Sequence, residues 1–185
     1  IERCATNNSS EIKAVYMGIY AALQFKDKYK TINLFSDSIV CINGLRSWIF
    51  NWVNNNNILY NSSKVPVANQ NTFLAIVRLI LINNFHINLY HVKGHVNLQS
   101  PISINRAMDV FTRMNNVSGV DCNLISEICK YNDKIDVLTR DVLDHFIKNN
   151  EDKIDLVRKK ENILNYNSYE LLRLKSLYEQ LINRY

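Results

Sequence analysis

The sequence lacks any apolar run of the roughly 20 residues needed to cross a lipid bilayer. Its densest apolar stretch, residues 73–85, is interrupted by Arg78 and by two asparagines. It also lacks a secretory signal, although residue 1 is Ile rather than Met, so we expect a trimmed or processed chain from which a targeting segment could have been removed. These absences argue against a membrane partner.

The sequence also lacks closely spaced pairs of cysteines. The four cysteines do not have the spacing of a zinc site, and Cys41 lies in an apolar stretch that is typical of a buried thiol. We therefore expect a reducing, intracellular location, in the cytoplasm or an organelle.

Acidic residues are scarce in the first part of the chain. Residues 1–115 contain 11 Lys and Arg but only five Asp and Glu, whereas residues 116–185 contain 11 and 12. A basic first part is compatible with a polyanionic partner such as a nucleic acid, and equally with an ordinary solvated surface.

Glycine is absent after Gly119, and helix-forming residues dominate the rest of the chain. We therefore expect one domain over residues 1–115 and an α-helical extension over 116–185. The extension has an apolar seam whose members are three or four residues apart, which must pack on the core, on a partner or on a second copy. The seam consists of Leu171, Leu174, Tyr178, Leu181 and Tyr185. We attribute the excess of asparagine, as in residues 54–57, to nucleotide bias.

The first part has an α/β pattern. Two segments alternate between apolar and polar residues, as strands do, and the segments around them have apolar residues at helical spacing. Strands are expected at 31–36 and 87–92, and helices at 11–23 (capped by Ser9 or Ser10), 38–52 and 72–83.

Three of the five acids in the first part occupy special places. Glu11 begins a helix, Asp37 follows an apolar strand, and Asp109 follows a loop and lies among apolar residues of a helix, where a carboxylate is costly without a cation. Oxygen ligands from three segments suit Mg²⁺ or Mn²⁺. Alternatively, Asp37 is a helix cap and Asp109 a surface acid.

Five segments, in order and at matching spacing, resemble motifs of type 1 ribonuclease H. The match covers residues 1 to about 115, and the quoted segments are Thr-Asn-Asn-Ser-Ser-Glu (6–11), Phe-Ser-Asp-Ser (35–38), Trp-Ile-Phe-Asn-Trp (48–52), His-Val-Lys-Gly-His (91–95) and Asn-Arg-Ala-Met-Asp (105–109). The resemblance implies a mixed sheet flanked by helices. It also implies an endonuclease that hydrolyses the RNA strand of an RNA–DNA hybrid with two Mg²⁺ or Mn²⁺ ions.

The resemblance also assigns roles to residues. Glu11, Asp37 and Asp109 match metal-binding acids of the family, and His95 matches a mobile histidine that assists proton transfer or product release. Six further residues match positions that contact the hybrid: Thr6, Asn7, Asn8, Trp48, Trp52 and Asn69. For the two tryptophans, packing in the core is an equally good interpretation.

The sequence departs from the family at its beginning. The first metal-binding Asp of the family, on its first strand, has no counterpart here, so we expect a preceding segment or a second polypeptide to complete the sheet. A basic protrusion of the family is replaced by Val53 and four asparagines, which weakens attraction to phosphate. The alternative function is therefore a catalytically inactive module that binds nucleic acid or serves as a scaffold in a larger assembly.

Overall fold

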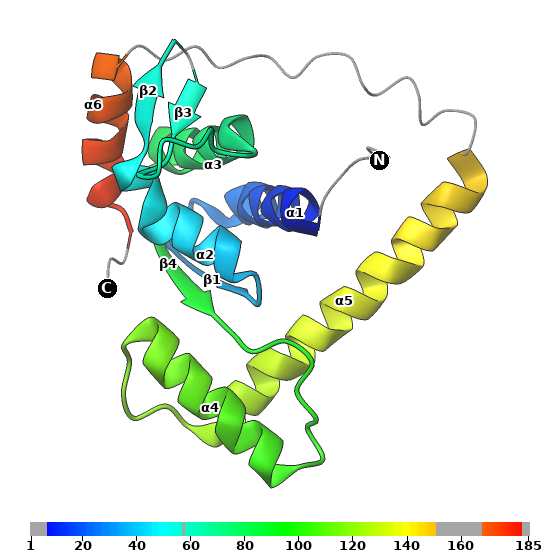
Figure 1. Cartoon of the computed structure of the whole chain (residues 1–185). Helices are drawn as coiled ribbons and strands as arrows, with labels where there is room; N and C mark the ends of the chain where they lie inside the picture. The colour runs from blue at the N-terminus through cyan, green and yellow to red at the C-terminus, as the bar shows by residue number, and fades with distance from the viewer. Residues whose placement is uncertain (1–6, 57, 151–167, 183–185) are drawn as a thin grey trace. The chain divides into compact units, whose positions relative to one another are not determined.

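The computed structural model describes residues 7–56, 58–150 and 168–182 (Figure 1). Over these ranges four strands lie among helices up to residue 91 and only helices follow, which confirms the predicted α/β class with a helical C-terminal extension. The described residues form two compact units. The larger unit contains residues 7–34, 38–89 and 168–182 apart from residue 57, and the smaller unit contains residues 35–37 and 90–150. None of the described helices is both long and apolar enough to span a bilayer.

The larger unit is built mainly from four helices and a hairpin. The helices are α1 (Asn7–Ala22), α2 (Ile39–Arg46), α3 (Gln70–Asn83) and α6 (Ser168–Glu179); the short 3₁₀ helices are η1 (Leu23–Phe25) and η2 (Trp48–Asn51); the antiparallel hairpin joins β2 (Val53–Asn55) to β3 (Ile58–Tyr60). Helix α1 buries one face, formed by Ile12, Val15 and Ile19, and it packs against α2 and α3.

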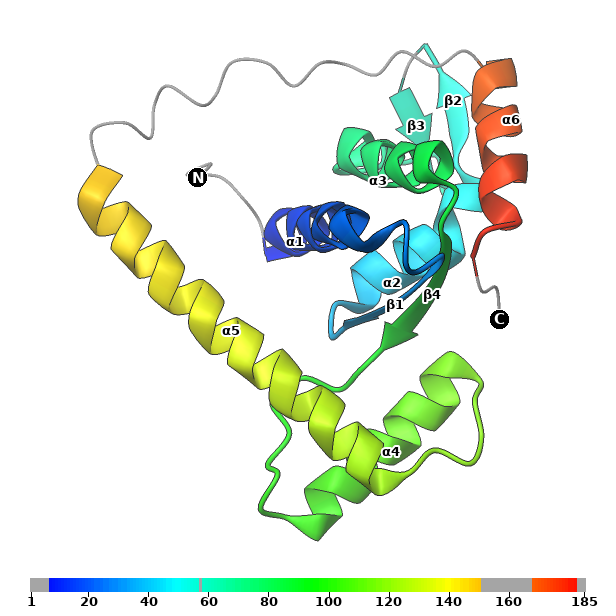
Figure 2. The ribbon, with the colours of Figure 1, turned by 180° about the vertical axis from the view of Figure 1, so that it is seen from behind.

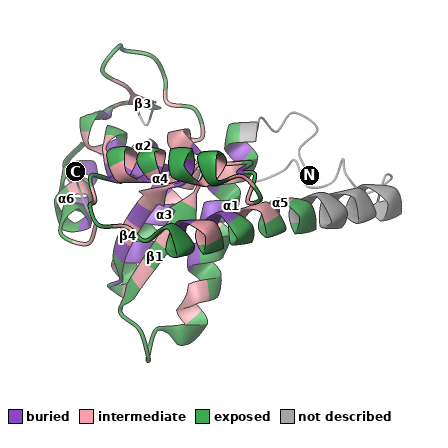
Figure 3. Cartoon of the chain, turned by 90° about the horizontal axis from the view of Figure 1, so that it is seen from below, coloured by how far each residue is buried: buried purple, intermediate pink, exposed green. Residues whose placement is uncertain are grey.

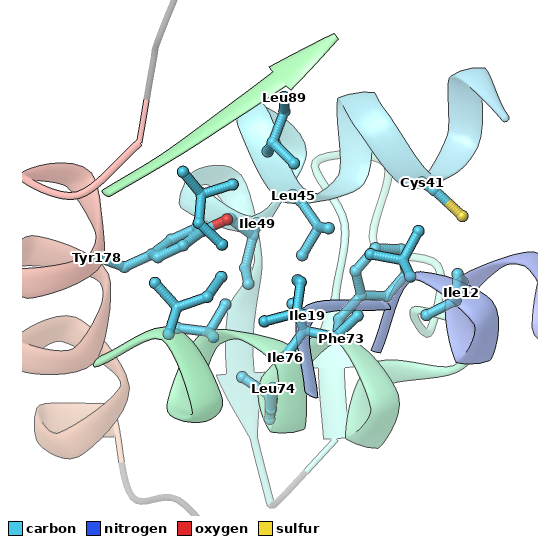
Figure 4. Close-up of a cluster of buried hydrophobic side chains, with 14 of the residues drawn as sticks. Ile12, Ile19, Cys41, Leu45, Ile49, Phe73, Leu74, Ile76, Leu89 and Tyr178 are labelled. Atoms are coloured by element: carbon cyan, nitrogen blue, oxygen red, sulfur yellow. The ribbon is translucent and has the colours of Figure 1, made fainter. Parts of the chain in front are cut away.

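The core of the larger unit collects side chains from every helix around it (Figure 4). Ile19 of α1, Leu45 of α2 and Ile76 of α3 are all fully buried there. Each such side chain contributes about 1.5–3 kcal/mol relative to an exposed position. The buried thiol predicted for Cys41 is confirmed, because its side chain is fully enclosed in this core.

Helix α6 belongs to this core, so the predicted seam packs on its own chain. Leu171, Leu174 and Tyr178 are buried, and α6 contacts α3 and β2 (Figure 2). The ring of Tyr178 stacks on Phe50 with 5.9 Å between centroids. Lys175 Nζ donates hydrogen bonds to the carbonyl oxygens of Phe50 and Trp52. Leu181 is half-buried, and Tyr185 lies outside the described residues.

Strands β1 (Thr31–Ser36) and β4 (His86–His91) form a two-stranded sheet. His86 N–H donates to the carbonyl of Lys30, and Val92 N–H donates to that of Ser36, so the two strands run in the same direction. Ile87 N–H donates to Leu181 O at 2.7 Å. Since successive N–H groups of a strand point to opposite edges, the residues after α6 cover the edge of β4 that faces away from β1.

The smaller unit joins the ends of both strands to two helices, α4 (Pro101–Asn115) and α5 (Cys122–Asn150). The first turns of α5 lie beside α4. A separate small core is formed by Val92, Val96, Ala107, Phe111, Ile125 and Cys129. Exposed residues predominate along the described surface of α5 (Figure 3).

Two predicted helices differ in extent from the observed ones. Helix α1 begins at Asn7, so neither Ser9 nor Ser10 is its cap. Ser9 is instead buried on the same face of the helix as Ile12. Burial of Ser9 therefore accompanies a helix that begins one turn earlier than predicted. The predicted helix 38–52 is divided at Ser47 into α2 and η2, and the tighter turn of η2 directs Ile49 into the core.

The asparagines also have a structural use that the sequence analysis missed. Six described non-glycine residues have a positive φ, and four of them are asparagines: Asn56, Asn69, Asn84 and Asn116. Asn84 and Asn116 end α3 and α4 in the left-handed conformation. Asparagine tolerates this conformation better than other residues with a side chain, so in a chain with only four glycines it replaces glycine at turns and helix ends.

Candidate active site

Asp37 follows the last residue of β1, where it is held at its backbone and at its carboxylate. The imidazole Nε2–H of His91 donates to the carbonyl of Asp37 at 3.2 Å. Ser38, and not Asp37, caps α2, because its hydroxyl accepts from Cys41 N–H. The carboxylate of Asp37 is therefore not needed by the helix that follows it.

The strand beside Asp37 is fixed by a buried asparagine. Asn115, in the last turn of α4, accepts a hydrogen bond from His91 N–H and donates one to His91 O, both at 2.8 Å. A third bond joins the same amide to Phe111 O. This bidentate contact fixes α4 against the end of β4.

The turn after β4 meets the Asp37 carboxylate directly. A Cβ added to Gly94 would lie 2.5 Å from Asp37 Oδ2, so any other residue at this position would displace the carboxylate. The next residue, His95, is exposed and has a φ of 53°. From α5, Asn132 Nδ2 donates to Asp37 Oδ2 at 3.3 Å. The extension therefore contacts the carboxylate that the family resemblance singles out.

Asp109 has a different environment from the one expected. It is exposed on α4, so the expected cost of a carboxylate in apolar surroundings does not arise. The reason is that Ala107 and Phe111 point into the small core while Asp109 is on another face of the helix. Asp109 lies in a surface pocket of about 380 Å³ together with Lys93, Arg106 and Arg113.

A second group of side chains lies at the same end of the smaller unit. One ligand atom from each of His95, Asp133 and Asp136 lies within 4.8 Å of the other two, and in the part of the chain that the structure describes this is the one such group of three. The negative charge of Asp133 also reaches Cys129, whose pKa is raised first by burial and further by that charge, while Lys93 opposes the rise. Glu11 belongs to the larger unit, one turn inside α1.

Comparison with known proteins decides the family. The sequence model of the RNase H family matches residues 1–116. This chain belongs to the ribonuclease H family. It is 40% identical over 90 residues to ribonuclease HI of Haemophilus influenzae and 38% identical over 90 residues to that of Pasteurella multocida, in each case over 49% of this chain and 53% of the relative. The chain thus spans about half the length of these relatives. No solved structure matches it.

The residues that the ribonuclease H resemblance links to substrate have mixed environments. Asn8 is exposed on α1, and Trp48 is 43% exposed. Trp52 is buried and meets Phe73 edge-on at 5.1 Å, as the packing interpretation predicted. Asn69 is half-buried with a positive φ at the start of α3. Thr6 and the side chain of Asn7 lie outside the described residues.

A pocket of about 350 Å³ lies beside the two tryptophans in the larger unit. Its lining includes Trp48, Trp52, Pro66 and Ala68, the last of which directly precedes Asn69. The pocket thus lies next to Asn69, one of the residues matched to a contact with the hybrid.

The chemistry of the donors in the smaller unit fits divalent metal ions. Ribonucleases H use such ions, and Asp37 presents a carboxylate held in place by Gly94 and Asn132. Asp109 also offers oxygen ligands, but its three cationic neighbours equally suit a phosphate group.

Sequence reasoning missed the asparagines and acids that support this site. Asn115, Asn132, Asp133 and Asp136 were not singled out, because each lies in a helical stretch of an asparagine-rich or charged sequence. The available signal for α5 was its spacing: Ile125, Cys129, Asn132 and Asp136 recur every three or four residues and so share a helix face.

Proposed function

We propose that this chain carries the catalytic part of a ribonuclease H that hydrolyses the RNA strand of RNA–DNA hybrids with two divalent ions, Mg²⁺ or Mn²⁺. The observation that carries the proposal is the placement of Asp37. Asp37 lies within a family-like segment, residues 35–38, at the end of β1, and its carboxylate closely approaches Gly94 of a second such segment. Carboxyl ends of parallel strands are where α/β proteins gather their ligands.

Glu11, Asp37 and Asp109 would hold the metal ions. When bound, two such ions activate a water and stabilise the leaving oxygen of the phosphodiester. His95 is exposed next to Gly94, so its imidazole has access to a proton of the reacting groups or of the product.

Substrate binding would use the cationic pocket around Asp109. Lys93, Arg106 and Arg113 supply three positive charges to one pocket, which suits the phosphates of a nucleic acid backbone. Exposed Asn8 and Trp48 support a second contact region, since an amide suits the 2′-hydroxyls of the minor groove and an indole stacks on a sugar or base.

The second edge of β1 would receive a further strand. No strand pairs with this edge over residues 7–56, 58–150 and 168–182. Ile32 and Leu34 of β1 are half-buried, and an added strand would bury them further. We propose that a preceding segment or a second polypeptide adds this strand and with it the family's remaining metal-binding Asp.

The test is cleavage of a labelled RNA–DNA hybrid by the protein expressed from its full reading frame. Asp37→Asn should abolish Mg²⁺-dependent cleavage, since the amide loses the charge that attracts the cation. Asp27→Asn, in the exposed lysine-rich turn, is the matched control and should cleave normally. Unchanged cleavage by Asp37→Asn would reject the assignment.

A second function remains open. The hairpin of β2 and β3 contains no basic residue, which removes a contact region for phosphate. This favours a catalytically inactive module that binds a hybrid or holds an assembly together. An acid on the added strand, shown by sequencing upstream of residue 1, supports the nuclease, whereas a non-acidic residue there supports the scaffold.

A further inference from the structure

We propose that His95, Asp133 and Asp136 form a binding site for a divalent transition metal, which shares no carboxylate with the proposed nuclease site and which, when occupied, withdraws His95 from its proposed role in proton transfer. Their ligand atoms all lie within 4.8 Å of one another. The site joins the turn after β4 to helix α5 of the extension. This inference does not rest on the proposed nuclease activity.

Helix geometry directs the two carboxylates to one place. Asp133 and Asp136 are three residues apart on α5, so they are neighbours on one face of the helix. Neighbouring residues of α5 anchor that face: Cys129, one turn before Asp133, is buried with its thiol 4.0 Å from Lys93 O, and Asn132 donates to the Asp37 carboxylate. Other residues of α5 therefore set the position of the two acids relative to the turn.

The backbone of the histidine is also constrained. His95 adopts a left-handed backbone conformation with a φ of 53°, an arrangement uncommon for a residue with a side chain. It directly follows Gly94, which packs against Asp37. The side chain of His95 consequently reaches α5 from a turn whose position is set by the strand end.

The ligand set indicates the kind of metal. One imidazole nitrogen and two carboxylate oxygens suit Mn²⁺ or Zn²⁺ better than Mg²⁺, which prefers oxygen ligands and retained waters. His95 is exposed, so water has access to complete the coordination.

Mn²⁺ alone is the probe for the test, with electron paramagnetic resonance as the measurement. The full chain carrying Asp37→Asn and Asp109→Asn serves as background, because it lacks two carboxylates of the proposed nuclease site. In this background we expect bound Mn²⁺ whose pulsed spectrum shows coupling to an imidazole nitrogen. Absence of that coupling overturns the proposal, and this result needs no further variant.

The ligands are then removed one type at a time. His95→Gln should abolish the nitrogen coupling, whereas His86→Gln, at an exposed histidine of β4, should keep it. Asp133→Asn with Asp136→Asn should weaken Mn²⁺ binding by more than about tenfold, since loss of even an outer partner of a ligand has that effect.

A control on the same helix completes the comparison. Glu127→Gln, at an exposed acid of α5, should leave Mn²⁺ affinity unchanged. Helix content is checked by circular dichroism for every variant. Nitrogen coupling that survives in His95→Gln, or an equal loss of affinity in the Glu127→Gln control, would show adventitious binding and overturn the site.

Discussion

The two helices of the extension, α5 and α6, make opposite kinds of contact. Helix α6 contributes Leu171, Leu174 and Tyr178 to the main core. Between residues 122 and 138, α5 buries Ile125 and Cys129 in the small core. It also directs the amide of Asn132 to Asp37 and brings two carboxylates close to His95. One extension therefore serves two purposes: its last helix stabilises the fold, and its first helix supplies polar groups to the candidate site.

The largest expected effect concerns α6. Tyr178→Ala should lower the free energy of unfolding by about 3–5 kcal/mol, because it removes a fully buried aromatic ring from the core. Chemical denaturation measures this change. The control Tyr169→Ala removes a ring that is 75% exposed on the same helix and should change the free energy by less than about 0.5 kcal/mol. An equal loss of unfolding free energy in the two variants would contradict the placement of α6 in the core.

The next effect compares substitutions at two glycines, one expected to change cleavage and the other expected to change stability. Gly94→Ala should displace the Asp37 carboxylate and lower hybrid cleavage by about 100-fold, the loss that a displacement near 1 Å can cause. Unfolding should change little, because a carboxylate end can move. Gly44→Ala, whose Cβ meets the ring of Phe73, should instead destabilise the core by about 1–3 kcal/mol. Cleavage and denaturation measured on both variants would contradict this account if the two glycines behaved alike.

A smaller effect tests the contact between α5 and Asp37. Asn132→Ala removes the amide that donates to Asp37 Oδ2 and should slow hybrid cleavage by about tenfold, equivalent to about 1.4 kcal/mol. Tyr131→Ala, at an exposed neighbour on the helix, is the control. A normal cleavage rate in Asn132→Ala would limit α5 to a structural role.

The smallest effect is a pH dependence of stability from α6. Burial lowers the pKa of Lys175 in the folded chain below its ordinary value of 10.5. Between the folded and unfolded pKa values the unfolded chain binds more protons, so the stability of the wild type should rise as the pH increases toward 10.5. Lys175→Met should show a smaller rise in the same range, as thermal unfolding at several pH values would reveal. An identical slope in both proteins would contradict the assignment.

The fold was largely predictable because its signals are local. Alternation located β1 and β4 to within a residue, and helical spacing located α3 and the seam of α6. The β2–β3 hairpin was missed because its signal is asparagine, and Asn56 acts there as a residue of positive φ. Where α6 would pack could not be read from the sequence, since an apolar seam does not identify the surface that covers it.

The candidate site was predictable only where motifs mark it. Asp37, Gly94 and His95 lie in family-like segments, and they are neighbours in the smaller unit. Asn115 and Asn132 are not in such motifs, because a hydrogen bond across 24 or 95 residues leaves no local pattern. The exposure of Asp109 was mispredicted, since apolar neighbours in sequence are not neighbours on the surface of a helix.

The most direct test of the central claim uses a hybrid whose RNA and DNA strands carry different labels, incubated with Mg²⁺ and the protein from its full reading frame. Our expectation is that the RNA strand is cut to products with 3′-hydroxyl and 5′-phosphate ends while the DNA strand stays intact. Stable binding of the hybrid with both strands uncut would contradict it and favour the scaffold.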